Sequence, residues 1–190
     1  MRKSLKLFIL VGVFLGFFVA GTSFADIINF DLNIGNEALS YGPWAAVEVN
    51  QSGDEALITV TGYGNYLINA FGINPSSGYT GYTSVSPDSF TEDFPSPKNM
   101  SEFGTYSLIF KGPNMAQAVS SLSFILNGSG WSNAADVLAF NADGYLAAAH
   151  IMMNDGTGNT GFASAVPIPA AVWLLGFGVV GLVGAKRRIG

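Results

Sequence analysis

The sequence contains no cysteine, one histidine and only eight basic residues among its 190. The lack of cysteine excludes disulfides, a thiol nucleophile and a cysteine-ligated metal centre. All thirteen acidic residues lie between positions 26 and 155, whereas Lys98 and Lys111 are the only basic ones there, so residues 26–165 carry a formal net charge of −11. Nucleic-acid binding needs a basic surface, so we expect no nucleic-acid partner.

The remaining basic residues lie at the two ends of the chain. Three of them precede an apolar run over residues 7–20, which is shorter than a membrane-spanning helix normally needs. Ser23 and Ala25 then supply small side chains at the two positions that signal peptidase reads. We therefore expect residues 1–25 to form a signal-peptide helix that signal peptidase removes after Ala25. An uncleaved anchor is the alternative, and in both cases residues 26–165 are exported.

The other end combines two prolines with an uncharged run. Residues 166–185 are largely apolar and reach about 30 Å as a helix, enough to span a bilayer core. Pro167 and Pro169 favour a helix start near Pro169 and leave the residues before it extended. We expect a C-terminal transmembrane helix that attaches the chain to the membrane, with residues 26–165 outside the cytoplasm. The basic stop-transfer cluster that sets this orientation is Lys186, Arg187 and Arg188.

A proline motif, an apolar helix with Trp and several glycines, and a terminal basic cluster together resemble a PEP-CTERM sorting signal. Such signals tag exported proteins of Gram-negative bacteria that make extracellular polysaccharide. The matching positions are Val166, Pro167, Pro169, Ala170, Ala171, Trp173, Leu174, Gly176, Gly178, Gly181, Leu182, Gly184, Arg187 and Arg188, and Ile168 replaces the namesake Glu.

The resemblance implies that exosortase, a polytopic membrane cysteine protease, recognises residues 166–190 and cuts near the proline motif. The processed chain would then reach the cell surface or the extracellular polysaccharide of a biofilm. Small residues along the helix, with Trp173, would let it pack closely against such a membrane partner. Gly176 to Gly181 also spell G-x-G-x-x-G, but no following helix or acidic residue supports a nucleotide site.

Residues 26–165 are predicted to form an all-β ectodomain, either a sandwich or a jelly roll. Apolar residues alternate in several short segments, and glycine-containing turns separate them. We expect Tyr106, Leu108 and Phe110 to face one way, and a single short helix over 115–121. The predicted strands are a hairpin of 45–50 with 57–61, then 66–71, 106–110 and 122–126, and a second hairpin of 137–140 with 145–153 around the turn at 141–144.

The segment 72–103 is predicted to be a long loop, with four prolines and many Ser, Thr and Gly residues. Its tyrosines are of the kind that stack on sugar rings, and its acidic residues are of the kind that bind hydroxyls or Ca²⁺. The alternative is that the aromatic rings close one end of the sandwich. The residues of this possible ligand loop are Tyr79, Tyr82, Asp88, Glu92 and Asp93.

A second candidate cation site lies in the glycine-bent segment 154–159, where Asp155 and Asn159 supply oxygen ligands. Beyond a possible Ca²⁺ ion, the sequence indicates no cofactor. His150 is predicted to lie on one strand face with Leu146, Ala148 and Met152, which favours a packing role over a general base.

No nucleophile motif accompanies His150, so we expect no enzyme. The predicted function is an exported structural or adhesive protein associated with exopolysaccharide. A carbohydrate-binding or Ca²⁺-binding module is the alternative, and a glycan hydrolase comes third.

Overall fold

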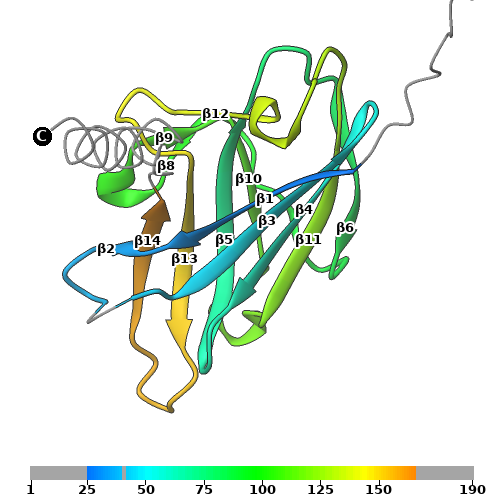
Figure 1. The fold of residues 1–190 in the computed structure, drawn as a ribbon. Helices are drawn as coiled ribbons and strands as arrows, with labels where there is room; N and C mark the ends of the chain where they lie inside the picture. Colours follow the sequence, from blue (N-terminus) through cyan, green and yellow to red (C-terminus); the bar gives the residue numbers. More distant parts are fainter. Residues whose placement is uncertain (1–24, 40–41, 166–190) are drawn as a thin grey trace, which may run out of the picture.

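The computed structural model describes residues 25–39 and 42–165. Two large antiparallel sheets of these residues pack face to face around the main core, so the prediction of an all-β fold is confirmed (Figure 1). No helix among them has the length and apolar character to cross a membrane. The expected signal-peptide helix, Ser23, the sorting motif, the transmembrane helix and the basic cluster lie outside the described residues.

The first sheet, sheet A, has the strand order β1-β3-β4-β11-β6. Its core-facing residues alternate with residues of the outer face, as in β3 and β11, because successive side chains of a strand point to opposite faces. The predicted hairpin is confirmed, since β3 pairs with β4 and Val49 lies opposite Ile58. The bounds are β1 (Asp26–Leu32), β3 (Ala45–Ser52), β4 (Glu55–Gly62), β11 (Ser121–Asn127) and β6 (Gly81–Ser86).

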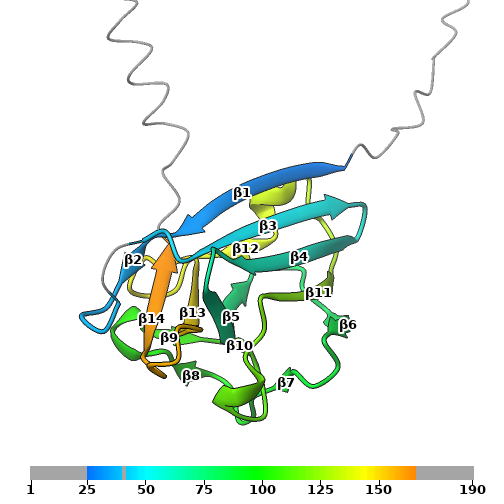
Figure 2. The same ribbon diagram turned by 90° about the horizontal axis from the view of Figure 1, so that it is seen from below.

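The second sheet, sheet B, has the order β2-β14-β13-β5-β10-β7, and a further short strand, β12, pairs with β5. Figure 2 shows the two sheets as separate layers. The bounds are β2 (Ile34–Gly35), β14 (Thr160–Ala165), β13 (Ala147–Met153), β5 (Tyr66–Pro75), β10 (Leu108–Lys111), β7 (Thr91–Glu92) and β12 (Leu138–Ala139).

The outer face of sheet B is covered by residues 98–106, which we call the cover segment. It contains β8 (Lys98–Asn99), the 3₁₀ turn η1 (Ser101–Phe103) and β9 (Thr105–Tyr106), with β8 paired to β9. Its apolar side chains form a second buried cluster against the sheet, separate from the main core. Strand β5 is therefore buried on both faces from Ile68 to Ile73. The cluster contains Met100, Phe103, Tyr106, Ala70, Ile109 and Ala148.

The prediction of one strand over 106–110 is wrong. The strand is broken at Ser107, whose backbone N–H donates to Asn74 Oδ1 at 2.7 Å. Leu108 and Phe110 then face the main core as expected, but Tyr106 belongs to the second cluster on the other side of the sheet. Residues i and i+2 of a continuous strand share a face, but Ser107 interrupts the strand. The two segments on either side of Ser107 pair with different partners and can therefore face opposite ways.

The second predicted hairpin is correct in its turn and wrong in its pairing. Gly144 has φ +84°, and its N–H donates to the Asn141 carbonyl at 3.1 Å. However, β12 pairs with β5, and β13 pairs with β5 and β14, so the two arms do not pair with each other.

The predicted helix over 115–121 is reduced to the 3₁₀ turn η2 (Met115–Gln117), because β11 begins at Ser121. Two further short 3₁₀ turns are η1 and η3 (Ala134–Asp136).

Candidate functional site

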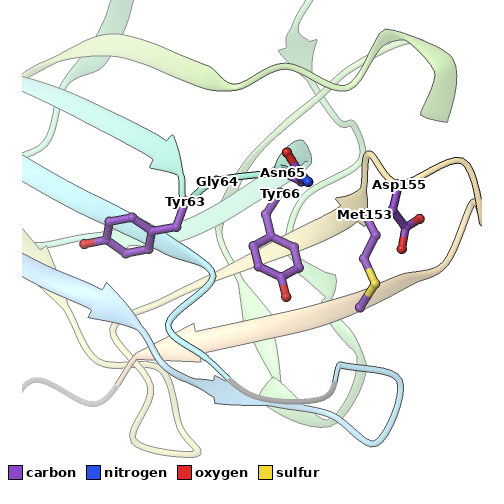
Figure 3. Close-up of a pocket in the computed structure, with 6 residues that line it drawn as sticks. All are labelled: Tyr63, Gly64, Asn65, Tyr66, Met153 and Asp155. Atoms are coloured by element: carbon purple, nitrogen blue, oxygen red, sulfur yellow. The ribbon is translucent and has the colours of Figure 1, made fainter.

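A pocket of about 370 Å³ lies where the β4–β5 turn meets the β13–β14 loop. Figure 3 shows the rings of Tyr63 and Tyr66 projecting from the β4–β5 turn, with Met153 beside Tyr66. The lining combines two phenol rings, a thioether, an amide and a carboxylate. The lining residues are Tyr63, Gly64, Asn65, Tyr66, Met153 and Asp155.

Local hydrogen bonds hold this pocket in shape. The Tyr66 N–H donates to the Tyr63 carbonyl at 3.0 Å and closes the turn, in which Gly64 has φ +55°. The Asn154 N–H donates to the Asn65 carbonyl at 2.8 Å, which ties the β13–β14 loop to the turn. A left-handed φ of this kind favours glycine, so the sequence Tyr-Gly-Asn-Tyr suits a tight turn with two flanking rings.

The Tyr63 ring is the accessible wall of the pocket, with 40% of the residue exposed. Its hydroxyl donates to Asp31 Oδ1 at 2.8 Å, and this hydrogen bond raises the pKa of Tyr63, with burial and the Asp31 charge adding to it. Tyr66 and Met153, in contrast, pack against the main core. The pocket therefore has a fixed floor and a ring held at its edge by a carboxylate.

Asp155 uses its carboxylate within its own loop. Oδ1 accepts hydrogen bonds from the Thr157 N–H at 2.9 Å and the Thr157 hydroxyl at 2.5 Å, and the hydroxyl bond is the main reason that the pKa of Asp155 is lowered. The Asn159 carbonyl accepts from the Met153 N–H at 2.9 Å. No group of three or more potential His, Cys, Asp or Glu ligands occurs in residues 25–39 and 42–165. A Ca²⁺ site at Asp155 and Asn159 stays a prediction.

The segment 72–103 is not one continuous loop, because the end of β5, strands β6, β7 and β8, and the turn η1 all fall within it. Tyr79 and Tyr82 pack against the main core, and the Tyr82 ring meets Phe110 edge-on with centroids 4.8 Å apart. Burial, followed by Glu92, raises the pKa of both tyrosines. These two rings therefore pack against the main core, as in the alternative to a ligand-binding role.

The acidic residues of the same segment do not converge. Glu92 lies in β7 beside Tyr82, whereas Asp93 forms an ion pair with Lys98, with Oδ1 and Nζ 2.5 Å apart. Asp88 is exposed in the connection between β6 and β7. The structure thus brings together Tyr79, Tyr82 and Glu92 and places the two aspartates elsewhere.

His150 lies on the outer face of sheet B, where its ring stacks on Phe162 with centroids 4.4 Å apart and planes 7° apart. Ala148 lies on this face as predicted, but Leu146 belongs to the main core, because β13 begins only at Ala147. Burial, followed by Lys111, lowers the pKa of His150.

Sequence reasoning missed the pocket at Tyr63 and Tyr66. The available signal was the pair of tyrosines around Gly64 and Asn65, a turn that exposes its flanking rings. The meeting of this turn with Asp155 depends on the pairing of β5 with β13, in which Tyr66 lies opposite Met153. Comparison of the chain with protein-family models, curated proteins and solved structures finds no match.

Proposed function

We propose that this chain is an exported, non-catalytic surface or extracellular-matrix protein with a β-sandwich ectodomain, delivered by exosortase and held among exopolysaccharide. The observation that carries the proposal is the order of sequence features over residues 166–190: proline motif, apolar run, basic cluster. Each part has a physical role in presenting a cleavage handle at a membrane.

The position of the folded region supports this route. Strand β1 begins at Asp26, directly after the expected signal-peptidase site at Ala25. Strand β14 is paired through Ala165, which lies opposite Ala147 and accepts the Leu146 N–H at 3.0 Å. Cleavage after Ala25 and near Pro167 would therefore remove no residue of any described strand.

Mass spectrometry of the protein from the cell-surface fraction tests the proposal. We expect the C-terminal peptide to end near the proline motif. In a variant with Pro167→Ala and Pro169→Ala, the helix can extend through the handle, so we expect full-length protein to accumulate at the inner membrane. Ile168→Val keeps both prolines and is the matched control. A wild-type surface peptide that still contains Trp173 and Gly184 would contradict C-terminal processing and would indicate an ordinary membrane anchor.

Carbohydrate binding is the second candidate function, and the Tyr63–Tyr66 pocket favours it. Tyrosine rings with nearby amide and carboxylate groups offer both an apolar face and hydrogen-bond partners for hydroxyl groups. A glycan array probed with the full chain in detergent tests this function. Tyr63→Ala should abolish any binding, whereas Phe140→Ala, which removes an exposed ring outside the pocket lining, should not.

A further inference from the structure

The two basic residues of the described region line the same pocket as the only histidine of the chain. This pocket, of about 120 Å³, lies on the outer face of sheet B beside the cover segment. Lys111 comes from β10, His150 from β13 and Lys98 from β8, three separate strands. The fold thus concentrates its cationic side chains at one place on a domain with a net charge of −11.

The two lysines differ in their charge balance. Lys98 is neutralised by Asp93, with Nζ and Oδ1 2.5 Å apart. Lys111 is exposed and forms no ion pair with any residue in 25–39 or 42–165. His150 is neutral at pH 7, because burial and then Lys111 lower its pKa. The lining therefore carries one uncompensated positive charge at neutral pH and two when His150 is protonated.

Asp93, the partner of Lys98, also lines the pocket, and most of the remaining lining is aromatic and apolar. The parallel rings of His150 and Phe162 form one wall, and Ala70, Met100 and Ile109 form the base. Asn99 adds an amide that donates and accepts hydrogen bonds. A ligand that fits this lining has one negative charge next to a compact ring with an apolar face.

We propose that this pocket binds a single hexuronate residue of an acidic polysaccharide, with its carboxylate at Lys111 and its ring against the His150–Phe162 wall. One uncompensated lysine matches the single charge of a carboxylate better than a doubly charged phosphate ester. The net charge of −11 on residues 26–165 disfavours polymers of higher charge density. The proposal goes beyond the sorting route, because it assigns a ligand to the ectodomain whichever way the chain is delivered.

The single imidazole allows a direct test by NMR on the full chain in detergent, prepared without a histidine tag. A bound carboxylate favours the charged imidazole against the opposing effect of Lys111, while Lys98 and Asp93 offset each other. We expect trigalacturonate to shift the His150 signals and raise the pKa of His150. Its methyl ester, which lacks the charge, and cyclohexanecarboxylate, which lacks the sugar, should do neither at equal concentration.

Variants separate the pocket from the overall electrostatic field. Lys111→Gln should weaken trigalacturonate binding about tenfold, as expected for the loss of one charge-assisted contact. Lys111→Arg should retain binding, and Asp93→Asn should strengthen it by freeing Lys98. Thr83→Asp lowers the net charge by the same unit as Lys111→Gln from an exposed position on β6 of the other sheet, and it should change affinity less than twofold, as a screened distant charge does.

Equal binding of trigalacturonate and its methyl ester would overturn the proposal, as would equal weakening by Lys111→Gln and Thr83→Asp. Equal binding of cyclohexanecarboxylate would overturn the sugar assignment. A dispersed amide spectrum of each variant shows that the variant is folded. If Lys111→Gln is not folded, Lys111→Arg keeps the test valid. None of these measurements depends on tail cleavage, so failure here and failure of the sorting proposal are distinguishable.

Discussion

The outer faces of the two sheets differ in what covers them. Sheet A presents polar side chains outward, such as Glu48 and Asn50 on β3 and Thr59 and Thr61 on β4, and these are exposed or half-buried. Sheet B presents mainly small and apolar residues on its outer face, and the cover segment packs on them. The difference shows that the residues at outer positions decide whether a sheet faces water or carries a third layer.

The covered face is also where the cationic pocket forms. Ala70 and Ala148 let the cover segment approach sheet B, and its edge then encloses the space between Met100, Lys111 and His150. The four predictions that follow test this contrast, from the largest expected effect to the smallest.

Ile109 and Ile125 form a matched pair, because each lies on the outer face of its sheet. Ile109 is 3% exposed beneath the cover segment, whereas Ile125 is half-buried on sheet A. We expect Ile109→Ala to lower the free energy of unfolding by about 2–4 kcal/mol and Ile125→Ala by about 1 kcal/mol or less. Urea denaturation measures both. Equal losses would mean that the cover segment contributes little to burial.

Gly72 and Gly81 test how closely the cover segment approaches. A Cβ atom at Gly72 would collide with Met100 Sδ and lie 3.2 Å from Tyr106 Cβ, whereas one at Gly81 on β6 would meet no atom within 4 Å. We expect Gly72→Ala to cost about 1–3 kcal/mol by overpacking and Gly81→Ala to be near neutral. Thermal melting of the two variants gives the comparison, and a neutral Gly72→Ala would show that the cover segment yields easily.

Tyr106 tests the polarity of the second cluster. Its hydroxyl is buried and has no hydrogen-bond partner in the described part of the chain. Burial raises the pKa of Tyr106 to about 12. Tyr106→Phe should therefore change stability at pH 7 by less than about 1 kcal/mol, since no hydrogen bond is lost.

The same substitution has a definite effect at high pH. The folded pKa lies above the unfolded value of about 10, so the contribution of Tyr106 to stability is complete below pH 10 and is lost as the pH rises towards 12. Tyr106→Phe should make the alkaline loss of stability shallower, as followed by urea denaturation between pH 9 and about 11.5. Tyr63→Phe is the comparison: it removes a hydroxyl whose pKa is also raised by its bond to Asp31, but Tyr63 is exposed, so the slope should change less. A slope unchanged by Tyr106→Phe would argue against burial of this hydroxyl.

Asp93→Asn should have the smallest effect on stability. The Asp93–Lys98 ion pair is partly exposed, with side-chain exposures of 28% and 33%, and such pairs contribute about 0–1 kcal/mol. The loss should shrink further in high salt because salt screens the pair. Melting temperatures at low and high NaCl measure it. A salt-independent loss above that range would show that the pair anchors the cover segment.

The regular part of the fold was predictable from alternation alone. Val47, Ile58 and Phe124 lie in strands where every second residue is apolar, and each faces the main core. The break at Ser107 was not predictable, because alternation continues unchanged through Tyr106 and Leu108. Only the hydrogen bond of Ser107 to the distant Asn74 side chain and the β8–β9 pairing place Tyr106 and Leu108 in different strands.

The candidate sites were harder to predict. The sequence shows that Lys98 and Lys111 are the only basic residues between positions 26 and 165. Their meeting at His150 depends on the pairing of β5 with both β10 and β13. Tyr79 and Tyr82 looked like ligand-stacking rings, because a Pro-rich and Gly-rich composition does not reveal that the segment forms β6 and β7. Burial of a ring against a distant strand is a tertiary effect, which local composition does not predict.

The C-terminal tether proposed above would give the position of β14 a mechanical consequence. Ala165 ends a strand that lies between β13 and β2, and its pairs with β13 run from Ala165 opposite Ala147 to Thr160 opposite Met152. A pull along β14 loads all the hydrogen bonds of this ladder together, in shear, so they must break at once. A pull across the strand would open them one at a time. Traction along the strand axis would therefore meet the greater resistance.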